Sequence, residues 1–94
     1  EYLSFLHELE AVIQQRKDNP DVNSYTSSLF AKGTKKIAQK VGEEATEVIL
    51  EAMAGEKELM IEETSDLLYH LLVLLTDQGL SLKDVEDILR ERHK

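Results

Sequence analysis

The sequence predicts an all-α fold, with about four helices packed as a bundle in a single domain over residues 1–94. Three observations support this prediction. Apolar residues recur at spacings of three and four, Gly and Pro stand at the ends of most of these periodic segments, and no segment alternates apolar and polar residues as a strand does. A chain of 94 residues has room for only one hydrophobic core.

The first predicted helix spans about Tyr2–Asn19 and is amphipathic. Its apolar residues at helical spacing are Phe5, Leu6, Leu9, Val12 and Ile13. Pro20 ends the helix, because the residue before a proline is displaced from the helical conformation. The segment Asp21–Gly33 is rich in Ser, Thr, Asn and Asp, and we expect a loop with one short helical turn through Tyr25–Phe30. Loops of this length often carry function.

The second and third predicted helices are the longest. The second spans about Thr34–Ala54 and stops at Gly55, a residue type that suits the left-handed position after a helix. Its apolar stripe comprises Ile37, Val41, Ala45, Val48 and Ala52. The third spans about Lys57–Gln78, and its part Leu67–Leu75 is apolar nearly all round. Such a helix is buried on most sides, which one chain of this length can hardly achieve alone, so we expect a homo-oligomer.

A last helix is predicted to begin after Ser81. Asp84 follows three residues later, which resembles a capping box at a helix start. The apolar residues of this helix are Leu82, Val85, Ile88 and Leu89.

Composition and charge exclude several classes of protein. Eleven basic against nineteen acidic residues give a net charge of −8, which argues against a nucleic-acid polymer as partner. No apolar run is long enough to cross a membrane, and we expect no membrane association. The chain has no cysteine, which excludes disulfides and fits a cytoplasmic protein. It begins at Glu1 rather than Met, as expected of a piece of a longer polypeptide or a trimmed chain.

Two acidic pairs border the apolar faces of the middle helices. At 100° per residue, Glu44 and Glu47 lie about 60° and about 120° to one side of the apolar stripe, whereas Glu43 points further away. Glu63 and Asp66 form a second i, i+3 pair beside apolar residues of the next helix. If Gly55 allows an antiparallel hairpin, the two pairs can face each other. (The pattern is E-E-x-x-E followed by E-x-x-D.)

Four carboxylates beside a hydrophobic core would repel one another and lose hydration. A hard divalent cation removes both costs, so we expect Mg²⁺, with Mn²⁺ as a substitute, and a phosphorylated substrate. Any one of these glutamates alone is better explained as a solvated helix surface. Two i, i+3 pairs on adjacent helices, both bordering the core, favour a functional site. A di-iron site is disfavoured, because neither Glu44 nor Glu63 is followed by His in a Glu-x-x-His motif.

Lysines gather at the start of the second predicted helix, where positive charge opposes the helix dipole. They are Lys32, Lys35, Lys36 and Lys40. A bound phosphate would turn this penalty into a gain, although the cluster taken alone is better explained as exposed lysines screened by water and salt. His70 lies on the face of Asp66, and we expect a hydrogen-bonded core histidine rather than a ligand or base.

Several runs together resemble the phosphoribosyl-ATP pyrophosphohydrolase family, over about Leu6–His93. They are Ser24-Tyr25-Thr26, the run Gly33–Glu47 with Lys-Ile-Ala-Gln-Lys-Val-Gly before the acidic motif, Glu63–Leu75, and Leu89–His93. The acidic motif alone is similar to the wider MazG-type all-α nucleotide pyrophosphohydrolases. The resemblance implies Mg²⁺-dependent hydrolysis of phosphoribosyl-ATP to phosphoribosyl-AMP and pyrophosphate, the second step of histidine biosynthesis. It further implies a homodimer with sites near the subunit interface and, in many bacteria, fusion to a phosphoribosyl-AMP cyclohydrolase.

By the same resemblance, Glu44, Glu47, Glu63 and Asp66 are the expected metal ligands and catalytic residues. Glu43 is assigned an outer or second-metal role. Expected substrate contacts are Lys36 and Lys40 for phosphate, and Tyr25 and Thr26 on the polar segment. Two alternatives remain open: a housecleaning hydrolase of free nucleoside or deoxynucleoside triphosphates, and a non-enzymatic helical oligomerisation module. The number of metal ions and the general base are not predicted.

Overall fold

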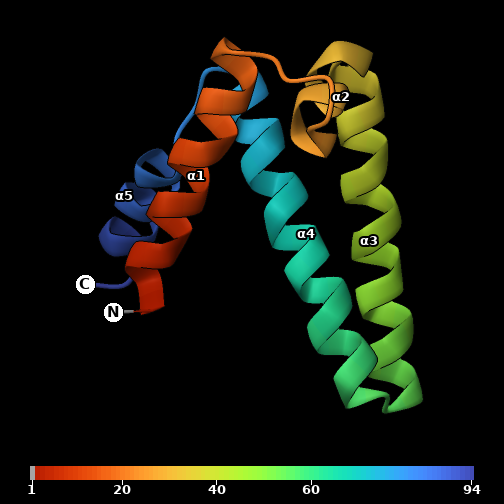
Figure 1. Ribbon diagram of the computed structural model, residues 1–94. Helices are drawn as coiled ribbons and strands as arrows, with labels where there is room; N and C mark the ends of the chain where they lie inside the picture. The colour runs from red at the N-terminus through yellow and green to blue at the C-terminus, as the bar shows by residue number, and fades with distance from the viewer. Residues whose placement is uncertain (1) are drawn as a thin grey trace.

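The computed structural model describes residues 2–94, with side chains from Phe5 onward. This part of the chain folds into five α-helices and no strand, so the all-α prediction is confirmed (Figure 1). The helices are α1 (Tyr2–Asp18), α2 (Tyr25–Lys32), α3 (Thr34–Ala54), α4 (Lys57–Asp77) and α5 (Leu82–Arg92). None of the helices in the described part is long and apolar enough to cross a membrane.

The segment Asp21–Gly33 is more helical than its composition predicts, because α2 occupies most of it. Its polar residues serve as caps. The side chain of Ser24 accepts a hydrogen bond from the backbone N–H of Ser27 (3.1 Å), and the Asp21 carboxylate accepts one from the N–H of Asn23 (2.8 Å). Ser and Asp are favoured at such positions, so the residues that indicated a loop in fact start a helix.

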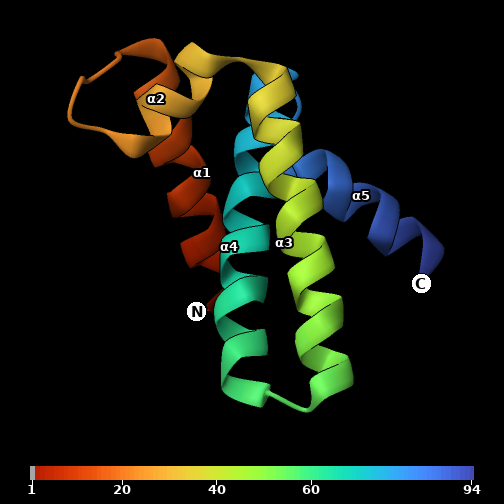
Figure 2. The ribbon, with the colours of Figure 1, turned by 90° about the vertical axis from the view of Figure 1, so that its right-hand side faces the viewer.

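Helices α3 and α4 form an antiparallel hairpin; they lie side by side near its turn and diverge toward the opposite end (Figures 1 and 2). The turn is short because Gly55 adopts a left-handed conformation with φ 75°, which glycine reaches without steric cost. The N–H groups of Gly55 and Glu56 then bond the carbonyls of Ala52 and Glu51. The hairpin predicted from Gly55 is therefore present.

The hydrophobic core lies at the end of the hairpin where α1, α2, α3 and α4 meet. Its buried members are Ile13, Leu29, Ile37, Leu72 and Val73. The first-helix stripe is only partly correct, because Phe5 and Val12 are 60% and 49% exposed. The second-helix stripe fades in the same way, from buried Ile37 to exposed Ala52, because only α4 covers that end of α3.

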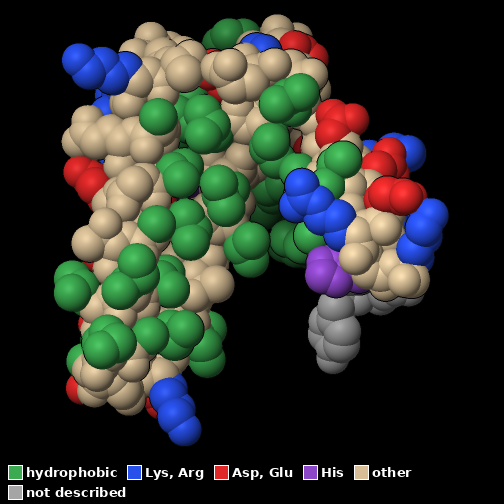
Figure 3. Space-filling view, turned by 180° about the vertical axis from the view of Figure 1, so that it is seen from behind, with side chains coloured by type: hydrophobic (Ala, Val, Ile, Leu, Met, Phe, Trp, Pro, Cys, Tyr) green, Lys and Arg blue, Asp and Glu red, His purple; other side chains and the backbone are tan. Residues whose placement is uncertain are grey.

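Helix α4 is less buried within one chain than its composition suggests. His70, Leu72, Val73 and Thr76 are buried, but Leu68 and Leu71 are 46% and 37% exposed. Further large apolar side chains are exposed on both helices of the hairpin: Ile49, Leu50, Met53, Leu59, Met60 and Ile61. We call these eight exposed residues the hairpin apolar strip; seen from behind, hydrophobic side chains follow this arm of the molecule (Figure 3).

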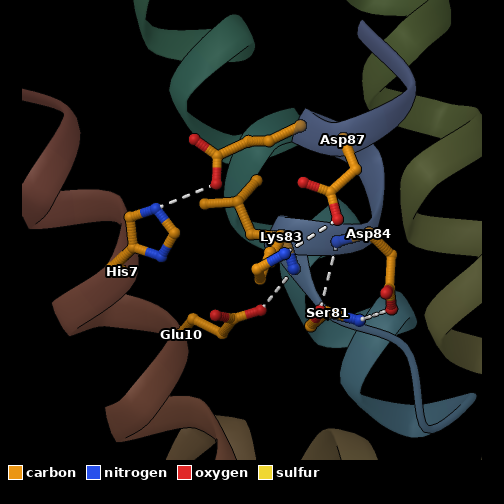
Figure 4. A network of polar contacts seen from close by, with 8 residues as sticks. His7, Glu10, Ser81, Lys83, Asp84 and Asp87 are labelled. Carbon is orange, nitrogen blue, oxygen red and sulfur yellow. Dashed lines mark hydrogen bonds and ion pairs between the residues drawn. The ribbon is translucent and has the colours of Figure 1, made fainter. Parts of the chain in front are cut away.

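Helix α5 is held to α1 by polar contacts at its start (Figure 4). The predicted capping box is confirmed: the Ser81 side chain accepts from the N–H of Asp84, and the Asp84 carboxylate accepts from the N–H of Ser81. Glu10 of α1 accepts a hydrogen bond from the N–H of Leu82 at 2.6 Å. The first turn of α5 is therefore capped both by Ser81 and by a side chain of α1. His7 pairs with Glu86 at 3.1 Å one turn further along.

Candidate metal and substrate site

The four carboxylates predicted as metal ligands come together across the α3–α4 hairpin. Their proximity is seen in the pKa of Glu63 on α4, which is raised from 4.5 to about 7. The largest cause is a hydrogen bond with Glu47, followed by desolvation and then by the negative charges of Glu47, Asp66 and Glu44. The structure thus brings both acidic pairs into one site, while their role as ligands stays a prediction.

The hairpin geometry explains why these residues meet. The i, i+3 spacing places the two acids of each pair on one helix face. The tight Gly55 turn then sets the two helices antiparallel, so that Glu44 and Glu47 of α3 face Glu63 and Asp66 of α4. Glu44 and Glu63 are half-buried at the helix interface, whereas Glu47 and Asp66 are exposed.

The donor set of this site fits a hard divalent cation. All four side chains offer carboxylate oxygens, the ligands that Mg²⁺ and Mn²⁺ prefer. Within residues 2–94, no three acidic or histidine side chains already surround a common point as metal ligands do. Carboxylates that repel turn apart or take up a proton, as the raised pKa of Glu63 indicates, and a cation would replace that proton.

The raised pKa of Glu63 predicts a pH-dependent stability cost. A carboxyl group whose folded pKa lies near 7 rather than 4.5 stabilises the fold fully below pH 4.5, and this contribution is lost as the pH rises through 7. In a chelator at pH 8, Glu63→Gln is therefore expected to raise the melting temperature by a few degrees, with a much smaller difference at pH 5. The exposed neighbour Glu62 supplies the control, Glu62→Gln. Equal responses of the two variants at pH 8 would contradict crowding at Glu63.

His70 joins three helices beside the acidic site. His70 is buried, and its Nδ1 lies 2.6 Å from Oε1 of Glu44 and 3.0 Å from the backbone oxygen of Asp66. Its Nε2 lies 3.0 Å from the hydroxyl of Tyr25 on α2. The expectation of a hydrogen-bonded core histidine is confirmed. Its contact with Glu44 was not predicted, because helix periodicity shows only that His70 shares the face of Asp66.

Tyr25 and Thr26, the predicted substrate contacts on the polar segment, connect α2 to α4. The Thr26 hydroxyl bonds the hydroxyl of Tyr69, and the rings of Tyr25 and Tyr69 stack with centroids 6.3 Å apart. Tyr25 remains 51% exposed, so one side of its ring faces solvent beside the His70–Glu44 contact. Their contact with substrate stays a prediction; Tyr69 was not identified from the sequence.

Lys36 and Lys40 are half-buried and lie one turn apart on α3. Both belong with Glu43 rather than with the four carboxylates. The pKa of Glu43 is lowered chiefly by a hydrogen bond from Gln39 (3.0 Å), opposed by desolvation, and further by the positive charges of Lys40 and Lys36. Glu43 is exposed and is not among the charges that act on Glu63. A phosphate role for the lysines and an outer role for Glu43 stay predictions.

An all-α hairpin that presents acidic i, i+3 pairs from both helices fits the class of all-α nucleotide pyrophosphohydrolases. Residues 6–93 match the protein family described as phosphoribosyl-ATP pyrophosphohydrolase. The chain belongs to this family, as the sequence resemblance predicted.

Curated relatives agree with this assignment. A histidine biosynthesis bifunctional protein HisIE from Vibrio cholerae is 58% identical over 96% of this chain and 43% of its own length. The proteins of that name from Photobacterium profundum and Yersinia pestis are 57% and 52% identical, over 97% of this chain and 44% and 45% of their lengths. The chain thus spans less than half the length of these relatives.

Proposed function

We propose that this chain hydrolyses phosphoribosyl-ATP to phosphoribosyl-AMP and pyrophosphate, with Mg²⁺, as the second step of histidine biosynthesis. The observation that carries the proposal is the convergence of four carboxylates on the hairpin of a chain from this family. Membership in the family supports phosphoribosyl-ATP as the substrate. The all-oxygen donor set supports Mg²⁺ as the metal.

Three groups of residues have separate roles in the proposed reaction: metal binding, phosphate binding and positioning of the substrate. Glu44, Glu47, Glu63 and Asp66 would hold the cation, which when bound would activate a water molecule and neutralise charge on the polyphosphate. Lys36 and Lys40 would bind phosphate oxygens, and Tyr25 and Thr26 would position the rest of the substrate. Attack of water at the α-phosphorus breaks the anhydride bond to the β-phosphate, which releases pyrophosphate and leaves phosphoribosyl-AMP.

We further propose that the chain works as part of a larger assembly in the cytoplasm. Its relatives are named bifunctional proteins, and the family resemblance makes a phosphoribosyl-AMP cyclohydrolase the partner, fused or associated. The hairpin apolar strip supports a homodimer or higher homo-oligomer, because monomeric proteins rarely expose contiguous apolar surface of this kind.

The proposal predicts pyrophosphate release from phosphoribosyl-ATP that requires Mg²⁺. We expect a chelator to abolish release and ATP or deoxynucleoside triphosphates to react poorly, because they lack the N1-phosphoribosyl group. A coupled pyrophosphate assay on the folded protein measures both. Efficient turnover of deoxynucleoside triphosphates would instead favour a housecleaning hydrolase. No turnover together with no specific Mg²⁺ binding would favour a helical oligomerisation module.

A further inference from the structure

We infer that His70 is a positioning residue: it holds the Glu44 carboxylate in one orientation at the acidic site, while Tyr25 fixes the opposite edge of the ring. The inference rests on the proposed function, because it assigns Glu44 to the metal site. It adds a residue that the acidic motif does not contain, and it connects α2 to the chemistry on the α3–α4 hairpin.

Burial makes this contact stronger than an ordinary surface pair. The side chains of His70 and Glu44 are only 6% and 12% exposed. At 2.6 Å, the bond between Nδ1 and Oε1 is short, as expected of a hydrogen bond to an ionised carboxylate. Water competes weakly for groups so little exposed, so this bond restricts the Glu44 side chain more than a solvent-facing partner could.

The contacts of the ring determine which nitrogen carries the proton. The backbone oxygen of Asp66 can only accept a hydrogen bond, and it lies 3.0 Å from Nδ1. Nδ1 therefore carries a hydrogen, which it shares between this oxygen and Oε1 of Glu44. In the neutral ring Nε2 is then an acceptor, and the Tyr25 hydroxyl donates to it. Both edges of the ring are occupied, so the ring cannot flip without losing hydrogen bonds.

A carboxylate held at one oxygen presents its other oxygen in a restricted range of directions. Partners of this kind behind a metal ligand typically raise metal affinity or activity by about 10–100-fold, because less order must be created on binding. A histidine that merely fills the core would lower stability when replaced and would leave metal affinity unchanged. The two roles therefore differ in Mg²⁺ affinity, which calorimetry measures without turnover.

Two substitutions separate the two nitrogens. In His70→Asn the amide N–H₂ takes the position of Nδ1 and keeps a donor for Glu44. In His70→Gln the amide reaches the position of Nε2, towards Tyr25, and the donor to Glu44 is lost. We expect Mg²⁺ binding about 10–100-fold weaker in His70→Gln and within about threefold of the parent protein in His70→Asn. His7→Gln is the matched control, because His7 pairs with Glu86 away from the site.

A second pair of variants keeps the inference testable if the buried substitutions unfold the protein. Tyr25→Phe removes the hydroxyl that bonds His70, whereas Tyr69→Phe removes a hydroxyl that bonds Thr26 instead. Both loosen α2 from α4, but only Tyr25→Phe is expected to weaken Mg²⁺ binding, by several-fold. Nitrogen NMR of the parent protein should also show a protonated Nδ1 on His70.

Parental Mg²⁺ affinity in His70→Gln would overturn the inference, as would equal losses in the Asn and Gln variants. Equal effects of the two tyrosine substitutions, or an Nδ1 without a proton, would overturn it as well. A parent protein that binds no Mg²⁺ would instead remove the metal site of the proposed function, so the two failures are distinguishable.

Discussion

Asp66→Asn is expected to lower kcat/KM for phosphoribosyl-ATP by about 100-fold or more. Residues that only support a metal ligand already contribute up to about 100-fold, and Asp66 is assigned as a ligand itself. Asp66 is exposed at the acidic site, and its charge is one of those that raise the pKa of Glu63. The substitution keeps the shape of the side chain and removes the charge that a cation requires. Its loss should appear in Mg²⁺ affinity as well as in turnover.

The control for Asp66→Asn is Glu62→Gln, an exposed acid on the same helix that does not act on Glu63. It should retain nearly parental activity. Circular dichroism should show the same helical content in both variants, because neither side chain is buried. Full activity in Asp66→Asn would contradict the assigned site, whatever the result for Glu62→Gln.

Ile37→Ala is expected to cause the largest loss of stability, about 2–5 kcal/mol. Ile37 is fully buried where α1, α2, α3 and α4 meet. Truncation to Ala leaves a cavity between these four helices, and the surrounding structure relaxes into it only partly. Domains of this size are stable by only about 5–15 kcal/mol, so the melting temperature should fall by on the order of 10 °C or more.

Chemical denaturation measures the free energy of unfolding of the Ile37 variant. Val22→Ala is the comparison, because Val22 is fully exposed between α1 and α2 and its truncation should change stability by less than about 0.5 kcal/mol. A similar small effect in Ile37→Ala would show that the core lies elsewhere.

The helices were predictable where a local signal was strong. Period-3.6 apolar patterns located α1, α3 and α4, and Gly55 located the turn of the hairpin. The segment before α3 was harder, because Ser24 and Asp21 are equally common in loops and at helix starts. Periodicity also shows which face of a helix is apolar but not whether a neighbour covers it, so Phe5 and Val12 were expected to be buried and are exposed.

The candidate site divides along the same line. Glu44 and Glu63 were predictable as parts of spaced acidic pairs, because the turn at Gly55 is enough to bring the pair on α3 next to the pair on α4. The hydrogen bond from His70 to Glu44 depends on how far α3 and α4 are shifted along each other's axes. The hydrogen bond to Tyr25 depends on where α2 packs against α4. No local pattern encodes either quantity.

The short Gly55 turn has a consequence for how the protein folds. Contacts between elements that are neighbours in sequence form quickly, because little loop entropy is lost in closing them. The most extensive helix contact here, α3 with α4, is of this kind, whereas α1 must return to α4 across two intervening helices. The acidic groups are thus crowded together by a contact that closes over a short turn, so ionic strength should influence the rate of folding as well as the stability of the folded state.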